Sequence, residues 1–230
     1  MNKYIKKTFE NALFEYESKD EKLILELNDY INKNVSYIYN FFGNDIKHEI
    51  PIIHIISTKR ELDTIYRERN EIREDQEVPN WLIGFSGNED IYYLSLDDYK
   101  NTVHSFKPED YEMKLLFFKK TIIHEYVHFI NKLFNKKYNV PLTIKCLVEG
   151  IAQLLSGQND DKQIDFNYSL EDILRSSNCY NGWYLVTKYI VENYSHDKII
   201  DLLLNKNKAE KFIIDIYDDI RVYYISNRLK

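Results

Sequence analysis

Residues 121–130 read Thr-Ile-Ile-His-Glu-Tyr-Val-His-Phe-Ile and carry the pattern His-Glu-x-x-His within an apolar run. On a helix, His124 and His128 lie one turn apart on one face, because residues i and i+4 are neighbours there. Two imidazoles in this arrangement can ligate one zinc ion, each at about 2.0–2.1 Å. Glu125 lies about 100° around the helix from His124, so it can reach a water molecule beside the metal. Two ligands and one carboxylate that accepts a proton are what a zinc hydrolase needs.

The same pattern also has an interpretation without a metal. It would then be a buried helix with two hydrogen-bonded core histidines and a glutamate at its edge. A chance match is roughly a one-in-a-hundred event in a chain with six histidines among 230 residues. A buried, charged glutamate without a partner would be costly, and this cost favours the metal site.

A zinc hydrolase usually has three protein ligands and keeps one position for water. A metzincin would need Gly and then His shortly after His128, but Asn131 and Phe134 stand at those positions. A helix predicted over residues 141–156 offers a better third ligand, because Glu149 is the only acid in it.

Glu149 is followed by two small residues, Gly150 and Ala152, which would let its helix approach the helix of residues 121–130 closely. A lone carboxylate on a packed helix requires a cation nearby. The cation is either the metal or a lysine such as Lys145, so a salt bridge is the alternative role of Glu149.

Composition excludes several classes of protein. The net charge of −6 gives no sequence-independent attraction to nucleic acid. The N-terminus has no apolar run typical of a signal peptide, and no window approaches 18 apolar residues. The two cysteines, Cys146 and Cys179, are typical of reduced thiols. We therefore expect a cytoplasmic protein with no nucleic-acid partner and no membrane span.

The first half of the chain predicts mixed α/β structure. Its expected elements are an edge strand over 11–16, a helix over 20–42 that ends at Gly43, a strand covered on both faces over 50–57, a helix from Thr58 to about Tyr66, and a β-hairpin of 81–86 and 90–96. His54 is expected to be a core or sheet histidine, and residues 96–105 are expected to form a loop.

The second half predicts helices only. They are expected over 108–136, over 141–156 with a stop at Gly157, in a turn at 170–174, and over 179–194, 197–204 and 210–226. The fold class is therefore α+β, a small mixed N-terminal sheet with helices followed by a mainly α-helical lobe. We expect one catalytic domain, 1–230, with a mixed lobe of 1–104 and a helical lobe of 105–230.

The zinc motif and the acid after it together resemble a known family. His124-Glu-x-x-His128, followed after twenty residues by Glu149-Gly150-x-Ala152, is similar to the gluzincin zinc metallopeptidases. The chain looks closest to the small bacterial proteins of the peptidase MA-like family, with a similar order of elements over roughly residues 10–205. The resemblance implies a zincin-like fold and one Zn²⁺ ion. It implies that His124, His128 and Glu149 are ligands and that Glu125 is the general base.

A further residue is implied less directly. In the aminopeptidases of this family, a tyrosine in a Tyr-x-Lys-Gly motif donates a hydrogen bond to the oxyanion. Tyr180-Asn-Gly resembles a shortened form without the lysine, so Tyr180 is the candidate, and Tyr184, one turn later, is the alternative. Either tyrosine could instead be a packing residue. The Gly-x-Met-Glu-Asn motif that binds a substrate amino terminus has no match in residues 84–89, so we expect an endopeptidase or oligopeptidase.

The resulting hypothesis is zinc-dependent hydrolysis of a peptide or protein substrate, with the strand 90–96 pairing with the extended substrate. One alternative is a zinc-binding, non-peptidase regulatory or interaction protein of the same fold. Another is a metal-free helical interaction protein in which the motif is accidental. The oligomeric state is left open.

Overall fold

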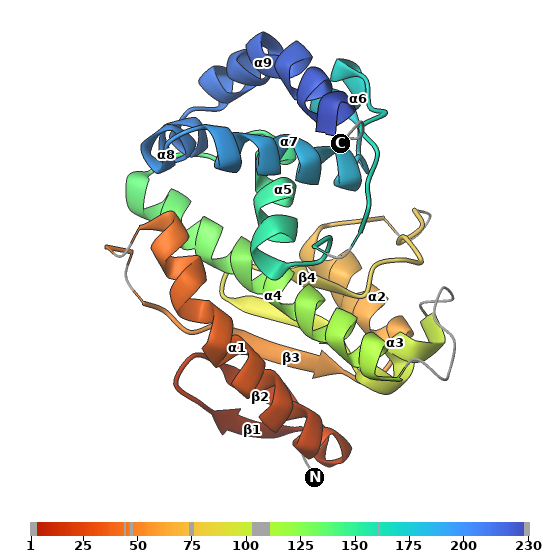
Figure 1. Cartoon of the computed structure of the whole chain (residues 1–230). Helices are drawn as coiled ribbons and strands as arrows, with labels where there is room; N and C mark the ends of the chain where they lie inside the picture. The colour runs from red at the N-terminus through yellow and green to blue at the C-terminus, as the bar shows by residue number, and fades with distance from the viewer. Residues whose placement is uncertain are drawn as a thin grey trace. The chain divides into compact units, whose positions relative to one another are not determined.

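The computed structural model describes residues 4–43, 45–46, 48–73, 76–102, 111–160 and 162–227 (Figure 1). It is an α+β structure, as predicted, with one five-stranded sheet and otherwise helices. The chain forms two compact units, the first of residues 1–40 and 47–130 and the second of residues 41–46 and 131–230. The expected single catalytic domain stays a prediction.

The sheet belongs to the first unit, and its strand order is β1-β2-β3-β5-β4. The strands are β1 (Ile5–Thr8), β2 (Leu13–Tyr16), β3 (Ile52–Ile56), β4 (Gly84–Ser86) and β5 (Asp90–Leu94). β3 is parallel to both of its neighbours, while the two outer pairs are antiparallel. The predicted hairpin is confirmed as β4 and β5. The predicted edge position of β2 is wrong, because β1, which was not predicted, pairs with its outer side.

The two faces of the sheet differ in burial. Phe14, Ile53, Ile55, Ile91 and Tyr93 share one face and are fully buried. On the opposite face, Leu62 of α2 (Lys59–Arg69) packs with Phe85, Tyr92 and, at the end of β3, Ile56. His54 is half-buried there. The prediction that the central strand is covered on both faces is therefore only half right.

Helices α1 (Glu21–Phe42) and α4 (Tyr111–Tyr138) lie side by side on the buried face (Figure 1), and Lys119 donates to Glu26 at 3.0 Å. Gly43 ends α1, as predicted, with a φ of +111° that favours glycine. The predicted start of α4 at Pro108 lies outside the described residues.

Residues 96–102 form a helix, α3 (Leu96–Thr102), where a loop was predicted. The Ser95 carbonyl accepts from the Tyr99 amide at 2.8 Å, and Asp97 and Asp98 lie at the positive end of the helix dipole. The buried ring of Tyr99 packs against Phe118 of α4 at 5.3 Å between ring centroids. Packing in the folded protein therefore stabilises a segment whose local apolar pattern was too short to predict a helix.

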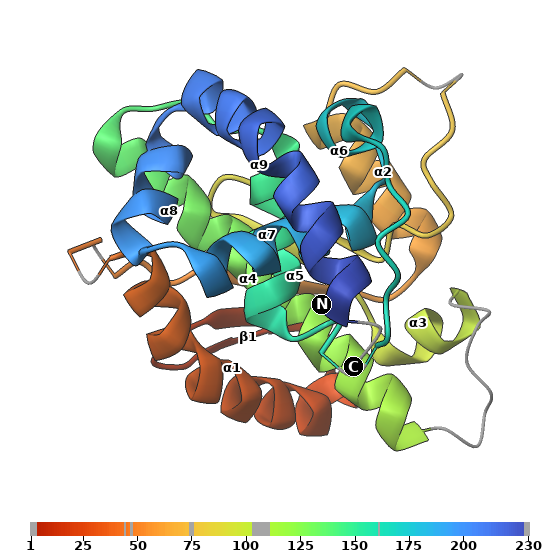
Figure 2. The same ribbon diagram turned by 45° about the horizontal axis from the view of Figure 1, so that its top comes forward.

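The second unit is helical. Its helices are α5 (Lys145–Ser156), α6 (Leu170–Arg175), α7 (Tyr180–Asn193), α8 (His196–Leu204) and α9 (Lys206–Asn227). α5 ends at Gly157, as predicted, with a φ of +67°, but it begins four residues later than predicted. α9 runs across α7 (Figure 2), where the Tyr224 hydroxyl donates to the Leu185 carbonyl at 2.8 Å.

The close approach of α5 to α7 depends on Gly150. A Cβ at this position would lie 2.1 Å from Thr187 Oγ1 and 2.5 Å from the carbonyl oxygen of Trp183. The nearest neighbours of Gly150 are therefore on α7, and the expectation that Gly150 and Ala152 make room for the helix of residues 121–130 stays a prediction. Glu149 precedes this glycine, so tight helix packing fixes the backbone that carries the carboxylate.

No described helix is long and apolar enough to cross a membrane.

Candidate metal centre

α4 presents the two histidines of the motif as a pair. The Nε2 atoms of His124 and His128 lie 3.0 Å apart, and their ring centroids are separated by 4.7 Å. Two nitrogens bound to one zinc ion at about 2.05 Å and a tetrahedral angle would be about 3.3 Å apart. The pair therefore needs only a small adjustment to ligate one ion.

The carboxylate predicted as third ligand lies near this pair. One ligand atom each of His124, His128 and Glu149 lies within 4.8 Å of the others, and this is the one such group of at least three His, Cys, Asp or Glu residues in the described part of the chain. Two imidazole nitrogens and one carboxylate oxygen are a donor set found at catalytic zinc sites. The residues could hold a divalent metal ion, and zinc as that ion stays a prediction.

Lys145 was the salt-bridge partner named for Glu149 in the alternative interpretation. Its amino group donates to the Ser177 carbonyl at 2.7 Å and lies 5.1 Å from the centre of the Trp183 ring. This lysine is thus bound at the connection between α6 and α7.

Glu125, the candidate general base, follows His124 on α4 and is 9% exposed. Burial of this charge in α4 is costly without a compensating partner. A carboxylate within reach of a water molecule at the metal could take a proton from it. Its role as base stays a prediction.

Tyr180 is the first residue of α7 and is half-buried. Its carbonyl accepts from Gln153 Nε2 at 2.9 Å, and its ring packs edge-on against Trp183. Gln153 lies one turn after Glu149 on α5, so one hydrogen bond connects this part of α5 to the start of α7. The sequence analysis missed Gln153, although a buried amide in an apolar helix is a visible signal.

Tyr184, the alternative to Tyr180, is only 3% exposed. Burial raises the pKa of its hydroxyl, and the charges of Asp160 and Glu192 raise it further. Lys188 lies 5.8 Å from the centre of its ring. These surroundings favour a packing role for Tyr184. Tyr180 is therefore the candidate for the donor to the oxyanion, and that role stays a prediction.

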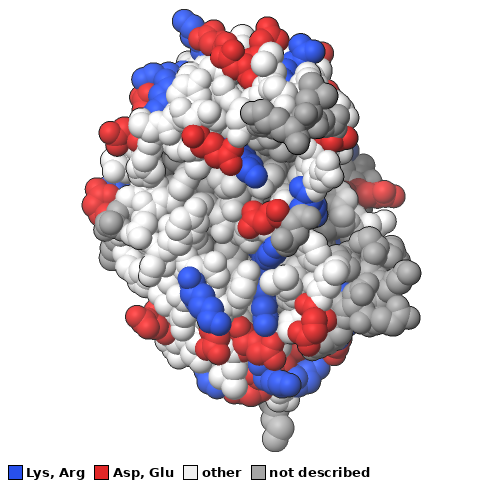
Figure 3. Space-filling model, viewed as in Figure 1, with Lys and Arg blue, Asp and Glu red and all other residues white. Residues whose placement is uncertain are grey.

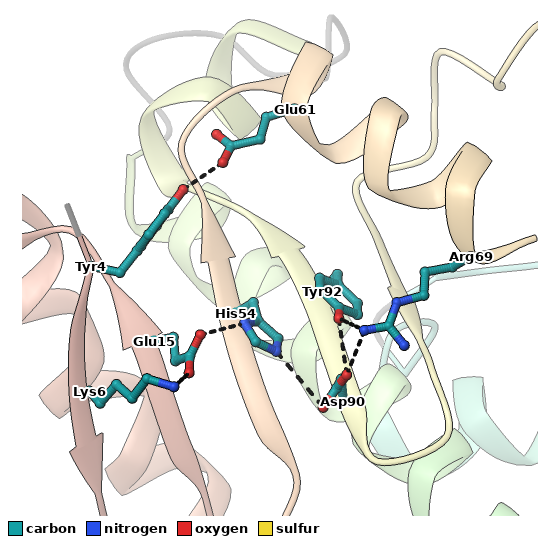
Figure 4. Close-up of polar contacts among 8 residues, drawn as sticks. All are labelled: Tyr4, Lys6, Glu15, His54, Glu61, Arg69, Asp90 and Tyr92. Carbon is teal, nitrogen blue, oxygen red and sulfur yellow. Dashed lines mark hydrogen bonds and ion pairs between the residues drawn. The ribbon is translucent and has the colours of Figure 1, made fainter. Parts of the chain in front are cut away.

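His54 is a sheet histidine, as predicted. Its Nδ1 lies 3.0 Å from Glu15 Oε2, and its ring stacks on Tyr92 with 4.5 Å between centroids (Figure 4). Asp90 and Arg69 continue this network, with 3.2 Å between Arg69 Nη2 and Asp90 Oδ2. Because the ring of His54 on β3 is engaged by this network, His54 is no candidate for a ligand of the metal set.

The predicted pairing of the strand 90–96 with a substrate is wrong, because β3 and β4 occupy both sides of β5. β4 stands at the end of the strand order and pairs with β5 through Gly84, Phe85 and Ser86.

Two hollows lie in the second unit, with volumes of about 440 and 530 Å³. The first is lined by Phe166, Asn167, Tyr168, Ser169, Tyr217, Arg221, Tyr224 and Ile225. The second shares Asn167 and Tyr168 and reaches Asn181 at the start of α7. Neither is lined by the three residues of the metal set.

On the face drawn in Figure 3, acidic and basic side chains of the described residues are interspersed among uncharged ones. That distribution is in keeping with the expected absence of a nucleic-acid partner, which stays a prediction.

Comparisons with known proteins were negative: no family model, no curated protein and no solved structure matches this chain.

Proposed function

We propose that this chain is a zinc metallopeptidase with a zincin-like fold, related to the gluzincins, that hydrolyses a peptide or protein substrate in the cytoplasm. The observation that carries the proposal is the proximity of His124, His128 and Glu149, whose ligand atoms lie within 4.8 Å of one another. Glu125 strengthens it, because a purely structural zinc site needs no base and usually has four protein ligands.

The side chains divide the work of hydrolysis. Zinc, when bound, supplies a Lewis acid that lowers the pKa of a water molecule to about 7. His124, His128 and Glu149 would hold the ion. Glu125 accepts the proton of the attacking water and passes it to the leaving amine. Tyr180 donates a hydrogen bond to the oxyanion that forms at the scissile carbonyl.

The edge of β4 is the place for the substrate main chain in this proposal. An extended peptide can add to the outermost strand of a sheet by backbone hydrogen bonds, which read side chains only weakly. This mode agrees with an endopeptidase or oligopeptidase of broad specificity.

The decisive experiment combines metal analysis with an activity screen. Protein purified without added metal should contain about one zinc ion per chain by elemental analysis, as the three-ligand site requires. It should cleave casein or quenched peptides, and a chelator should abolish cleavage. Zinc without hydrolysis would favour the non-peptidase alternative, and protein without metal would favour the accidental motif.

A further inference from the structure

Gln153 of α5 is a buried residue, only 4% exposed, and its side-chain amide lies between two backbone carbonyl groups. Its Nε2 donates to the Tyr180 carbonyl at 2.9 Å and to the Glu149 carbonyl, one turn earlier on α5, at 3.4 Å. An amide nitrogen carries two hydrogens, so one Nε2 can serve both acceptors. The same group therefore links the turn of α5 that carries a candidate metal ligand to the first turn of α7, which crosses α5 (Figure 1).

The oxygen of the Gln153 amide is bound as well. Oε1 accepts from Asn159 Nδ2 at 2.7 Å, and Asn159 Oδ1 in turn accepts from Lys162 Nζ at 2.8 Å. Asn159 is 2% exposed and lies just after the turn at Gly157 that ends α5. These contacts fix the orientation of the Gln153 amide, because a flipped amide would place its oxygen against two carbonyl oxygens.

The start of α7 depends on this link. Cys179, the residue before α7, makes no capping hydrogen bond through its side chain to the described residues. A buried polar network whose members are all satisfied holds one geometry, because breaking it leaves buried groups without partners. The position of a catalytic group affects rate steeply, since a misplacement of about 1 Å can cost roughly 10²-fold. The amide of Gln153 is therefore placed where it controls the position of Tyr180.

We propose that Gln153 is a positioning residue for hydrolysis, which holds Tyr180 in place relative to the candidate metal ligand Glu149. It acts through the backbone of the two helices rather than by contact with the substrate. Asn159 keeps the Gln153 amide in the orientation that this role requires. The catalytic meaning of the link rests on the function proposed above, whereas the hydrogen bonds themselves do not.

A kinetic double-mutant cycle tests the positioning role. Gln153→Met keeps the length of the side chain and removes both hydrogen bonds of the amide nitrogen. It should keep the zinc content and the KM for a quenched peptide, and it should lower kcat about tenfold, less than the roughly 10²–10³-fold cost of removing an oxyanion donor itself. In a Tyr180→Phe background, Gln153→Met should change kcat by less than about twofold, because the hydroxyl that it positions is already absent.

Gln163→Met is the matched control, because Gln163 is an exposed glutamine in the loop after α5. It should leave kcat within about twofold of the wild type, as expected for a surface substitution. A loss of kcat in Gln153→Met that persists in full in the Tyr180→Phe background would indicate a general structural role and overturn the proposal. An unchanged kcat in Gln153→Met, or a loss of its zinc, would overturn it too.

Asn159→Asp covers the case in which Gln153→Met does not fold. The aspartate still accepts from Lys162, but it presents an oxygen to Gln153 Oε1, so the Gln153 amide should flip. The flip turns Oε1 toward the Tyr180 carbonyl and breaks the link without changing either residue. This variant should also lose kcat about tenfold, with KM and zinc content kept, and only where Tyr180 is present. Wild-type kcat in a folded Asn159→Asp protein would contradict the proposal.

NMR of the full chain tests the hydrogen bonds independently of activity. The side-chain amide protons of Gln153 should exchange with solvent at least about tenfold more slowly than those of Gln163, because they are buried and hydrogen-bonded. Their resonances should move in Asn159→Asp and stay in place in Gln163→Met. Fast exchange in the wild type, or unchanged resonances in Asn159→Asp, would reject the link. Wild-type protein without peptidase activity would refute the proposed function and the positioning role with it, and the NMR result would still decide the link.

Discussion

Gly150 of α5 faces Thr187 of α7 so closely that a Cβ on the glycine would lie 2.1 Å from the threonine hydroxyl oxygen. The same Cβ would lie 2.5 Å from the carbonyl oxygen of Trp183, which is also on α7. The backbone that carries Glu149 is thereby held against α7.

Gly150→Ala should therefore destabilise the protein by about 1–3 kcal/mol, the usual cost of overpacking. Urea denaturation gives the free energy of unfolding. Gly87→Ala is the control, because its nearest neighbour, the Asp90 carbonyl oxygen, would lie at an ordinary contact distance of 3.4 Å. Equal stability of the two variants would show that α5 and α7 can separate without cost.

His128→Ala should abolish zinc binding, because two ligands remain where three are needed. Elemental analysis after dialysis against trace zinc measures the bound zinc. The loss of zinc affinity should exceed the roughly 10–100-fold loss that follows when a residue outside the ligand set is changed. His196→Ala is the control, since His196 is exposed and lies 2.7 Å from the Phe41 carbonyl. Retention of a full equivalent of zinc by His128→Ala would reject this residue as a ligand.

Glu125→Gln should keep the metal and lose turnover. The amide preserves the size of the side chain but cannot accept a proton, and general base catalysis contributes roughly 10²–10⁴-fold to rate. The measurement is kcat on a quenched peptide together with the zinc content of the same sample. Near wild-type turnover with zinc bound would remove Glu125 from the mechanism.

The polar network on the sheet predicts a dependence of stability on pH. Partial burial would raise the pKa of Glu15, but hydrogen bonds and charge from Lys6 and His54 outweigh it and hold the pKa below its usual 4.5 (Figure 4). A carboxyl group whose pKa is lower in the folded state stabilises the protein above the unfolded-state pKa. This stabilisation is lost as the pH falls through the folded-state value.

Between pH 6 and pH 3, the wild type should thus lose more unfolding free energy than Glu15→Gln does. Glu10→Gln, at an exposed position between β1 and β2, should follow the wild type. Parallel curves for the wild type and Glu15→Gln would show that Lys6 and His54 do not stabilise the charged form.

Local patterns were sufficient to predict the elements that carry the site. The apolar periodicity of α4 and the spacing of its histidines predict the pair at 3.0 Å, because residues i and i+4 share a helix face. The isoleucine-rich run of β3 likewise predicts a central strand. Glu149 was found from its isolation in an apolar helix together with the family resemblance.

Other features depend on tertiary packing and had no local signal. β1 reads Ile-Lys-Lys-Thr and is a strand only because β2 pairs with it. α3 is stabilised where Tyr99 packs on Phe118. The neighbour of Gly150 could not be predicted either, since a small residue shows that something approaches closely but not which helix.

On the half-open face of the sheet, directly paired residues form one row across all five strands: Lys6, Glu15, His54, Tyr92 and Phe85. If β2 slipped by a single residue against β3, Glu15 would move to the sealed side and Phe14 would emerge into water. A register shifted by one residue is thus unfavourable for two reasons. The Glu15 carboxylate would be buried away from its cationic partners, and the aromatic ring of Phe14 would be exposed to water. The row therefore favours the native register of β2 against β3 over a register shifted by one residue.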